Sequence, residues 1–373
     1  MAEKNLDFDT VIDRTHTNSL KYDFAVQRGK PKDVLPLWVA DMDFQVSSYI
    51  QEALAGSVAH GIFGYSEAAG SYFEAVAGWM GRHYGWNVEE PWLVKTPGIV
   101  FALAQAVRAF TEPGDAVLLQ QPVYYPFSQV IRDNGRKIVD NTLVQGEDGR
   151  YRIDFADFEE KIRSCKVKLF FLCNPHNPVG RVWTKEELER VGRICLDNGV
   201  MIAVDEIHGD LVLPPHRHTP FATVSEELAQ HCIVCTSPSK TFNLAGLLVS
   251  DIIIPNDAIR EAFCKKMAPY YLWPGNFGAV AQITAYTEGE EWLEALLAYL
   301  KENAEYIAAF ITERMPQVKY RIPEATYLAW LDFRALGMSD EALWHFMRHE
   351  AKVATDNGVM FGLNGEGRGF QRL

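Results

Sequence analysis

Long apolar runs are missing from this chain. Of its 373 residues 48% are hydrophobic, yet no run approaches the ~18 apolar residues that a membrane-spanning helix requires. The first ten residues, MAEKNLDFDT, contain no apolar segment of the kind found in a signal peptide. We therefore expect a cytoplasmic protein with no membrane partner.

Basic charge is also scarce. The 36 lysines and arginines are outnumbered by 49 aspartates and glutamates, so the net charge is -13. Proteins that bind nucleic acid present clustered cations to its phosphates, and an acidic chain is a poor candidate for that role. We expect no nucleic-acid partner.

Cysteine is too sparse for a disulfide scaffold, since the whole chain has only six. Cys232 and Cys235 form a CxxC pattern, but their odd separation along a strand points the thiols to opposite faces, which disfavours a metal or redox pair. His216 and His218 lie in a proline-rich loop without a nearby cysteine or acidic residue, so we expect no metal. The sequence also has no Walker motif, no Gly-x-Ser-x-Gly elbow and no internal repeat.

What the chain does have is an alternation of apolar runs and helical periodicity. The expected strands are 93–96, 116–120, 167–173, 200–205, 233–237 and 249–255. Short apolar runs separated by helices predict an α/β fold with a mainly parallel sheet covered on both faces. Thr184-Lys185-Glu186-Glu187 has the pattern of a capping box, so residues 167–205 are expected to form a βαβ unit.

The pattern changes near residue 280. A long amphipathic segment, EEWLEALLAYLKENAEYIAAFITERM, is followed by the strand-like TYLAWLDF and another helical pattern. We expect an N-terminal arm at 1–45 that contributes to the small domain, a large domain at 46–280, and a small α+β domain at 281–373.

Polar residues stand where the expected strands end. Ligands of open α/β sheets bind beyond the carboxyl ends of the strands, so these residues are candidates for one site. They are Pro97, Gly98, Tyr124, Asn177, Asp205, Ser237, Ser239 and Lys240. Together they indicate a charged, aromatic cofactor that carries a phosphate. A simpler interpretation makes Tyr124 and its neighbour Tyr125 core aromatics.

Three segments at these separations, NPHNPVG (174–180), VDEIH (204–208) and SPSKTFNLAGL (237–247), resemble the fold-type I pyridoxal-phosphate enzymes of the class I/II aminotransferase superfamily. WVADMDF (38–44), GIFGYS (61–66), YLAWLDFR and GRGFQRL are similar to the MalY/PatB group of cystathionine β-lyase-like carbon–sulfur lyases. The resemblance spans nearly the whole chain. It implies a seven-stranded, mainly parallel sheet in the large domain and pyridoxal 5′-phosphate as cofactor. The implied reaction converts cystathionine, cysteine or cysteine S-conjugates to thiol, pyruvate and ammonia.

The resemblance also implies catalytic roles. Lys240 forms a Schiff base with the cofactor aldehyde and, once substrate displaces it, serves as the base at the substrate Cα. Asp205 keeps the pyridine nitrogen protonated, so that the ring can accept electrons. Tyr124 stacks on the ring, Asn177 hydrogen-bonds the phenolic oxygen, and His208 stands where aminotransferases usually carry a tyrosine.

The cofactor phosphate is expected at a helix N-terminus, where unpaired N–H groups and the helix dipole favour an anion. Tyr65 matches a family tyrosine that reaches the phosphate of the neighbouring subunit, which implies a homodimer with shared active sites. Tyr65 is also a candidate to protonate the departing sulfur. The residues of the same chain that are expected to bind the cofactor phosphate are Gly98, Ile99, Val100, Ser237 and Ser239.

For the substrate, Arg372 matches the arginine that binds the α-carboxylate in a bidentate manner. Trp38 and Ala40 are assigned to substrate binding, and the stretch 269–276 is a further candidate for the side-chain pocket. The chain stops at Leu373, whereas relatives continue through a final strand and helix, so we expect the small domain to lack these elements.

Two other functions remain open. An aminotransferase would use the same cofactor residues, and a catalytically weak regulatory protein that binds pyridoxal phosphate would keep the same fold. Leu248 stands where many class I aminotransferases carry a phosphate-binding arginine, and it favours the lyase, as do WVADMDF and GIFGYS. The short C-terminus is the feature that favours the regulatory protein.

Overall fold

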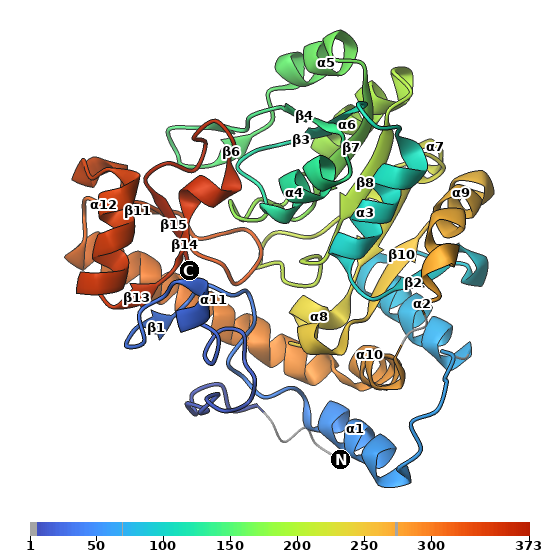
Figure 1. Cartoon of the computed structure of the whole chain (residues 1–373), viewed down its shortest axis with the longest axis horizontal. Helices are drawn as coiled ribbons and strands as arrows, with labels where there is room; N and C mark the ends of the chain where they lie inside the picture. The colour runs from blue at the N-terminus through green and yellow to red at the C-terminus, as the bar shows by residue number, and fades with distance from the viewer. Residues whose placement is uncertain (1–5, 69, 273–274) are drawn as a thin grey trace.

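The computed structural model describes residues 6–68, 70–272 and 275–373. Its centre is a seven-stranded sheet in the order β2-β10-β9-β8-β7-β3-β4 (Figure 1). The strands are β2 (Leu93–Thr96), β3 (Ala116–Leu119), β4 (Lys137–Asp140), β7 (Val167–Cys173), β8 (Met201–Asp205), β9 (Cys232–Thr236) and β10 (Ser250–Ile253). Only β10 is antiparallel to both of its neighbours, so the mainly parallel sheet is confirmed.

Six of these strands coincide with expected runs, and β4 was missed. Its sequence, KIVD, is short, begins and ends with a charged residue, and lies at the edge of the sheet. An edge strand has a neighbour on one side only and needs no continuous apolar run. Its pattern was therefore too weak to predict from the sequence.

Helices cover both faces of the sheet. The side chains of α3 (Ile99–Phe110), α4 (Pro126–Asp133) and α9 (Asp257–Met267) share one core with one face. Those of α2 (Gly70–Tyr84), α5 (Phe155–Ser164), α6 (Lys185–Asp197) and α10 (Asn276–Glu288) share the other core. In Figure 1, α3 and α4 lie in front of the sheet. Cys232 and Cys235 belong to opposite cores, as their spacing predicted, and all six cysteines are free thiols.

The βαβ unit at 167–205 is confirmed. β7 and β8 pair in parallel, and α6 connects them. The Thr184 hydroxyl accepts a hydrogen bond from the Glu187 N–H, and the Glu187 carboxylate accepts one from the Thr184 N–H, which is a capping box. The helix ends at Asp197, just before Gly199, which has a left-handed φ of 64°.

The C-terminal part forms a second layer around the long helix α11 (Glu290–Arg314), which matches the expected amphipathic segment. A four-stranded antiparallel sheet has the order β11-β12-β15-β14, and α12 (Asp340–His345) packs with it through Leu343. Its strands are β11 (Lys319–Tyr320), β12 (Trp330–Asp332), β14 (Asp356–Asn357) and β15 (Phe370–Arg372). The strand expected over TYLAWLDF is thus shorter, because Thr326–Ala329 form no strand.

The N-terminal segment joins this second layer. β1 (Leu35–Pro36) pairs in parallel with β13 (Val353–Ala354), so the dark blue segment lies beside the red one in Figure 1. This pairing supports an arm that contributes to the small domain, while the limits at residues 45 and 280 stay a prediction. The remaining α-helices and strands are α1 (Ser48–His60), β5 (Val144–Gln145), β6 (Tyr151–Arg152), α7 (Glu226–Ala229) and α8 (Pro238–Thr241).

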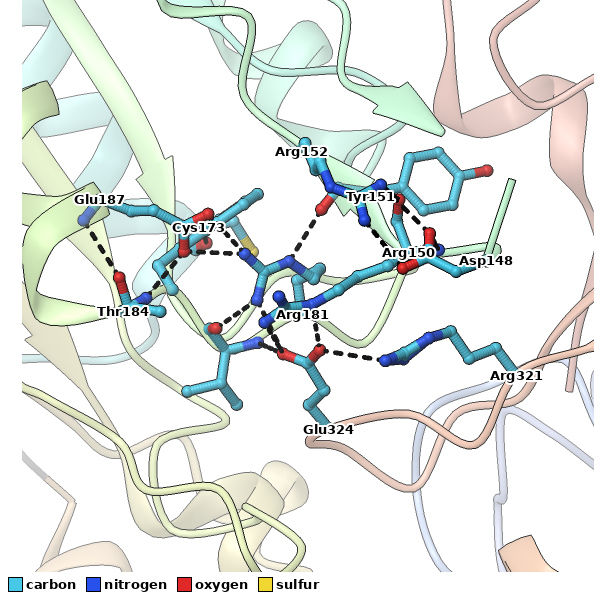
Figure 2. Close-up of polar contacts among 12 residues, drawn as sticks. Asp148, Arg150, Tyr151, Arg152, Cys173, Arg181, Thr184, Glu187, Arg321 and Glu324 are labelled. Carbon is cyan, nitrogen blue, oxygen red and sulfur yellow. Dashed lines mark hydrogen bonds and ion pairs between the residues drawn. The ribbon is translucent and has the colours of Figure 1, made fainter. Parts of the chain in front are cut away.

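A buried ion cluster connects the two layers (Figure 2). Arg181, in the loop after β7, donates to Glu324 at 2.8 Å and to both oxygens of Glu187 at 2.7 Å. Glu324 follows β11, and its other oxygen accepts from Arg150 at 2.7 Å. Both side chains of the Arg181–Glu324 pair are 2% exposed. Within the part of the chain that the structure describes, no helix has the length and apolarity to cross a membrane.

Candidate active site

A cavity of about 570 Å³ collects residues that end or follow β2, β3, β7, β8 and β9. The strands supply the rigid frame, and the polar side chains lie where the strand order leaves the carboxyl ends open. Most of the predicted site residues line this one cavity. They are Trp38, Ala40, Gly98, Ile99, Val100, Tyr124, Asn177, Asp205, His208, Ser237, Ser239, Lys240 and Arg372.

Lys240 lies in the short helix α8, directly after β9. Its Nζ donates a hydrogen bond to the carbonyl oxygen of Ala40 at 2.5 Å, and the Tyr327 hydroxyl donates to the same oxygen at 3.0 Å. Burial, with a smaller contribution from the charge of Arg372, lowers the pKa of Lys240 to about 8. An amine with this pKa has a substantial neutral fraction near neutral pH, so it can act as a nucleophile or a base.

The segment WVADMDF holds the Ala40 carbonyl in place. Asn243, three residues after Lys240, accepts from the Met42 N–H at 3.0 Å and donates to the Met42 and Phe44 carbonyls at 2.9 and 3.1 Å. On the other side, Asp41 and Asp43 form ion pairs with Arg14 and Lys21 of the N-terminal segment. The motif therefore fixes the backbone that contacts the lysine.

Asp205 ends β8 and is 5% exposed. Its carboxylate accepts a hydrogen bond from the Ile207 N–H at 3.1 Å, and no cation among the described residues forms an ion pair with it. Burial raises the pKa of Asp205 to about 7. A buried carboxylate without a cation can hold a protonated ring nitrogen, which would supply the missing positive charge.

His208 is buried in the same wall of the cavity. Its Nδ1 has no hydrogen-bond partner among the described residues, and burial lowers the pKa of the imidazole to about 3. The ring is therefore neutral at physiological pH. It can donate or accept a hydrogen bond to a bound ligand without adding charge.

The part of the cavity at the N-terminus of α3 suits an anion. Gly98 caps α3, and the first intrahelical hydrogen bond runs from the Ala102 N–H to the Gly98 carbonyl, which leaves the preceding N–H groups free. A Cβ built on Gly98 would meet no atom within 4 Å, so this end of the cavity is open space. Leu248, which stands where many class I aminotransferases carry a phosphate-binding arginine, also lines the cavity. Its backbone is left-handed, with a φ of 52°.

The two serines differ from each other. The Ser237 hydroxyl donates to the Val249 carbonyl at 2.7 Å and accepts from the Ser239 N–H at 3.1 Å, so it caps α8. The resemblance implied that the Ser237 hydroxyl donates to the cofactor phosphate, but its proton is already donated to the Val249 carbonyl. The Ser239 hydroxyl has no partner among the described residues and remains available.

Arg372 lies in β15 and reaches the cavity from the second layer. It donates to the Asn177 Oδ1 at 3.2 Å, which leaves the Asn177 Nδ2 free to donate to a ligand oxygen. It also forms a buried ion pair with Asp356, directly opposite in β14. Sequence reasoning missed Asp356, because no motif marks it and only strand pairing brings it to Arg372. Arg372 is 3% exposed and lines the cavity, as the resemblance implied.

Tyr124 follows β3 and lines the cavity as a half-buried side chain. Its N–H donates to the Asn177 carbonyl at 3.1 Å, so the two predicted cofactor residues are linked through the backbone. Burial raises the pKa of the Tyr124 hydroxyl to about 12. Tyr125 lines the cavity too and is exposed, so it is not a core aromatic.

Tyr65 does not line this cavity. It is fully exposed and lies beside Ser66, Glu67 and Tyr271 in a separate surface hollow. Its assignment to a neighbouring subunit therefore stays a prediction. Of the candidate stretch 269–276, Trp273 and Pro274 fall outside the described residues, and the others do not line the cavity.

One histidine has a partner that the sequence did not reveal. His218 lies 3.1 Å from Glu206, a buried residue next to Asp205, although no acidic residue stands near it in the loop. The structure, over the residues it describes, contains no group of three or more side chains able to hold a metal ion.

Residues 32–370 match the model of the aminotransferase class I and II family. The chain belongs to this family. Cystathionine beta-lyase PatB of Bacillus subtilis is 45% identical over 99% of the chain and 95% of PatB, and protein MalY of Escherichia coli is 35% identical over 98% of the chain and 93% of MalY. The chain is also similar to cystalysin from Treponema denticola, whose crystal structure contains a pyridoxal 5′-phosphate cofactor. The two sequences are 38% identical, and the match covers 98% of this chain and 93% of cystalysin with a TM-score of 0.94. The predicted superfamily, fold and MalY/PatB resemblance are confirmed.

Proposed function

We propose that this chain is a pyridoxal-phosphate-dependent carbon–sulfur β-lyase. It cleaves cystathionine, cysteine or cysteine S-conjugates to thiol, pyruvate and ammonia. The observation that carries the proposal is one cavity that joins Lys240, the uncompensated Asp205 and the open N-terminus of α3. The similarity to PatB over 99% of the chain supports the lyase among the reactions of this cofactor, and so does Leu248 at the cavity wall.

The residues present fit the cofactor. Asp205 would hold a proton at the ring nitrogen, Tyr124 would cover a face of the ring, and Asn177 would donate through Nδ2 to the phenolic oxygen. The free N–H groups at the start of α3 and the Ser239 hydroxyl would bind the phosphate. When bound there, the cofactor supplies an electron-accepting ring that stabilises negative charge at the substrate Cα.

The chain's own residues would carry the proton transfers. Arg372, already oriented by Asp356, binds the substrate α-carboxylate and presents the Cα–H bond. Lys240 takes the Cα proton on its Nζ, for which a pKa of about 8 is well suited. The Cβ–S bond then breaks with its electron pair on sulfur, and Lys240, or Tyr65 of the partner subunit, returns a proton to the departing thiolate. Water releases the remaining fragment as pyruvate and ammonia.

We further propose that the enzyme is a homodimer with shared active sites, in which Tyr65 reaches the partner's cofactor phosphate. Ile62 and Phe63, shortly before Tyr65 in the chain, are 72% and 67% exposed, and Tyr271, which lines the same surface hollow as Tyr65, is 82% exposed. Contiguous exposed apolar side chains mark a protein–protein contact. All six cysteines are free, which suits a reducing cytoplasm.

The proposed reaction is tested by incubating the cofactor-loaded protein with cystathionine and no keto acid. We expect equal amounts of pyruvate, ammonia and thiol, and little glutamate from alanine or aspartate with 2-oxoglutarate. Lys240→Ala protein is the control for uncatalysed breakdown. Glutamate formation faster than thiol release under matched conditions would overturn the lyase in favour of an aminotransferase, and a protein that binds the cofactor without either product would be regulatory.

A further inference from the structure

A short turn at the edge of the cavity carries an arginine that no part of the mechanism uses. Arg28 ends the 3-10 helix Val26–Arg28, and its side chain lines the same cavity as Lys240 and Arg372. The turn is firmly anchored: Gly29 has a φ of 74°, its carbonyl accepts from the buried Arg348 at 3.0 Å, and the Lys30 N–H donates to the Ala25 carbonyl at 3.0 Å. The position of Arg28 at the rim is therefore set by the fold.

The guanidinium of Arg28 has no counterion in the part of the chain that the structure describes. No described residue forms a hydrogen bond or ion pair with its side chain, which is exposed. By contrast, Arg372 deeper in the cavity is paired with Asp356 and Asn177. A guanidinium presents a rigid fork of donors that matches a carboxylate, so an unpaired one beside a ligand cavity is ready to bind an anion.

Two buried cations, Lys30 and Arg348, lie next to this turn. Lys30 is 8% exposed and lies with its Nζ 3.8 Å from the Trp38 ring, and Trp38 lines the cavity. Arg348 is 6% exposed and its Nε has no hydrogen-bond partner among the described residues. Burial lowers the pKa of Lys30, and the charges of Arg348 and Arg28 lower it further. The carboxylate of Asp356 acts in the opposite direction on Lys30, but Asp356 is already paired with Arg372.

We propose that Arg28, supported by the positive field of Lys30 and Arg348, is a second carboxylate subsite that makes the enzyme prefer thioether amino acids with an anionic distal end. Arg372 binds the α-carboxylate, and Arg28 binds the carboxylate beyond the sulfur. The inference rests on the proposed function, because it assigns a substrate class to the lyase. Cystathionine carries a distal carboxylate, whereas cysteine and S-alkyl cysteines do not.

The subsite can be tested by binding, separately from turnover. Two ligands of equal length, 2-aminoheptanedioate and 2-aminoheptanoate, differ only in a terminal carboxylate or methyl group and lack the cleavable sulfur. Calorimetric titration of the cofactor-loaded protein should give a Kd about tenfold lower for the dicarboxylate, as expected for a hydrogen bond to a charged group. Arg28→Met keeps the length of the side chain and should remove this preference, and Arg28→Lys should keep part of it. Arg314→Met, an exposed arginine at the end of α11, is the matched control and should leave both Kd values unchanged.

The matching substrates are S-(2-carboxyethyl)cysteine and S-propylcysteine. The ratio of their kcat/KM values should fall about tenfold in Arg28→Met, through KM. Thiol release without any preference in the parent, or an equal loss for both substrates in Arg28→Met, overturns the subsite while the lyase stands. A preserved Kd preference without thiol release overturns the lyase while the subsite stands. Failure of the parent to bind either analogue overturns the subsite, and the lyase falls with it only if neither substrate releases thiol.

Discussion

Lys240 is the residue on which the chemistry depends most directly. Its Nζ donates a hydrogen bond to the Ala40 carbonyl in the cavity wall, and its burial favours the neutral amine. We expect Lys240→Ala to lose the visible absorption of the lysine-linked cofactor and to slow turnover by at least the ~10²–10⁴-fold of a positioned base. Absorption spectra and pyruvate release check this. A variant with a borohydride-reducible lysine linkage and near-normal turnover would exclude Lys240.

Asp205 offers a second residue-level test. Asp205→Asn keeps the shape of the side chain but cannot hold the ring nitrogen protonated. We expect cofactor to remain bound while turnover falls about 10–100-fold, the equivalent of a hydrogen bond to a charged group. The exposed Asp133→Asn is the control. If the Asp205 variant turned over as fast as the parent, Asp205 would not be the partner of the ring nitrogen.

Between elements, the buried Arg181–Glu324 pair joins the loop after β7 to the segment after β11 (Figure 2). Removing one partner of a buried pair leaves an uncompensated charge, although Glu187 would still neutralise Arg181 in part. We expect Glu324→Gln to lower the free energy of unfolding by up to about 3 kcal/mol at pH 7. Glu305→Gln, which breaks an exposed pair with Lys301, should cost less than about 1 kcal/mol. Urea unfolding measures both, and equal small losses would contradict a role for this pair in joining the layers.

The same pair predicts a pH dependence. Burial alone would raise the pKa of Glu324, but Arg150 and Arg181 hold it below its usual value of 4.5. A lowered pKa in the folded state adds stability above the unfolded pKa, and this stability is lost as pH falls through the folded pKa. The difference in unfolding free energy between the parent and Glu324→Gln should therefore be full at pH 7 and shrink below about pH 4.5. A difference that stays constant down to pH 3 would contradict the ion pair as its source.

At the scale of the whole molecule, the prediction concerns the second subunit. Tyr65 is exposed and outside its own chain's cavity, so Tyr65→Phe should weaken cofactor retention only if Tyr65 serves a partner's site. Mixing Tyr65→Phe with Lys240→Ala protomers should then restore activity, because each hybrid dimer contains one site with both native residues. Activity of the mixture, after subunit exchange is verified by mass, checks this. Exchange without any recovery would count against a shared site.

Much of the fold, and many of the residues that line the cavity, could be predicted from the sequence alone. Local patterns depend on residues that are close in the sequence, so they can be recognised without the structure. They include the apolar runs that form β7 and β8, the Thr184 capping box and the polar residues at the strand ends. Because the carboxyl ends of parallel strands meet at one edge, Asp205 and Lys240 had to lie near each other once the strands were recognised.

Only the tertiary structure decided which distant segments complete the cavity. The Ala40 carbonyl meets Lys240 across 200 positions, Arg372 meets Asn177 across 195, and Arg28 reaches the rim through a turn anchored by Arg348. No periodicity or motif encodes such contacts, because they arise from how the layers pack and not from neighbouring residues. The tertiary structure also decided that the Ser237 hydroxyl donates to the Val249 carbonyl and caps α8. In the same way, only the pairing of β14 with β15 brings Asp356 to Arg372.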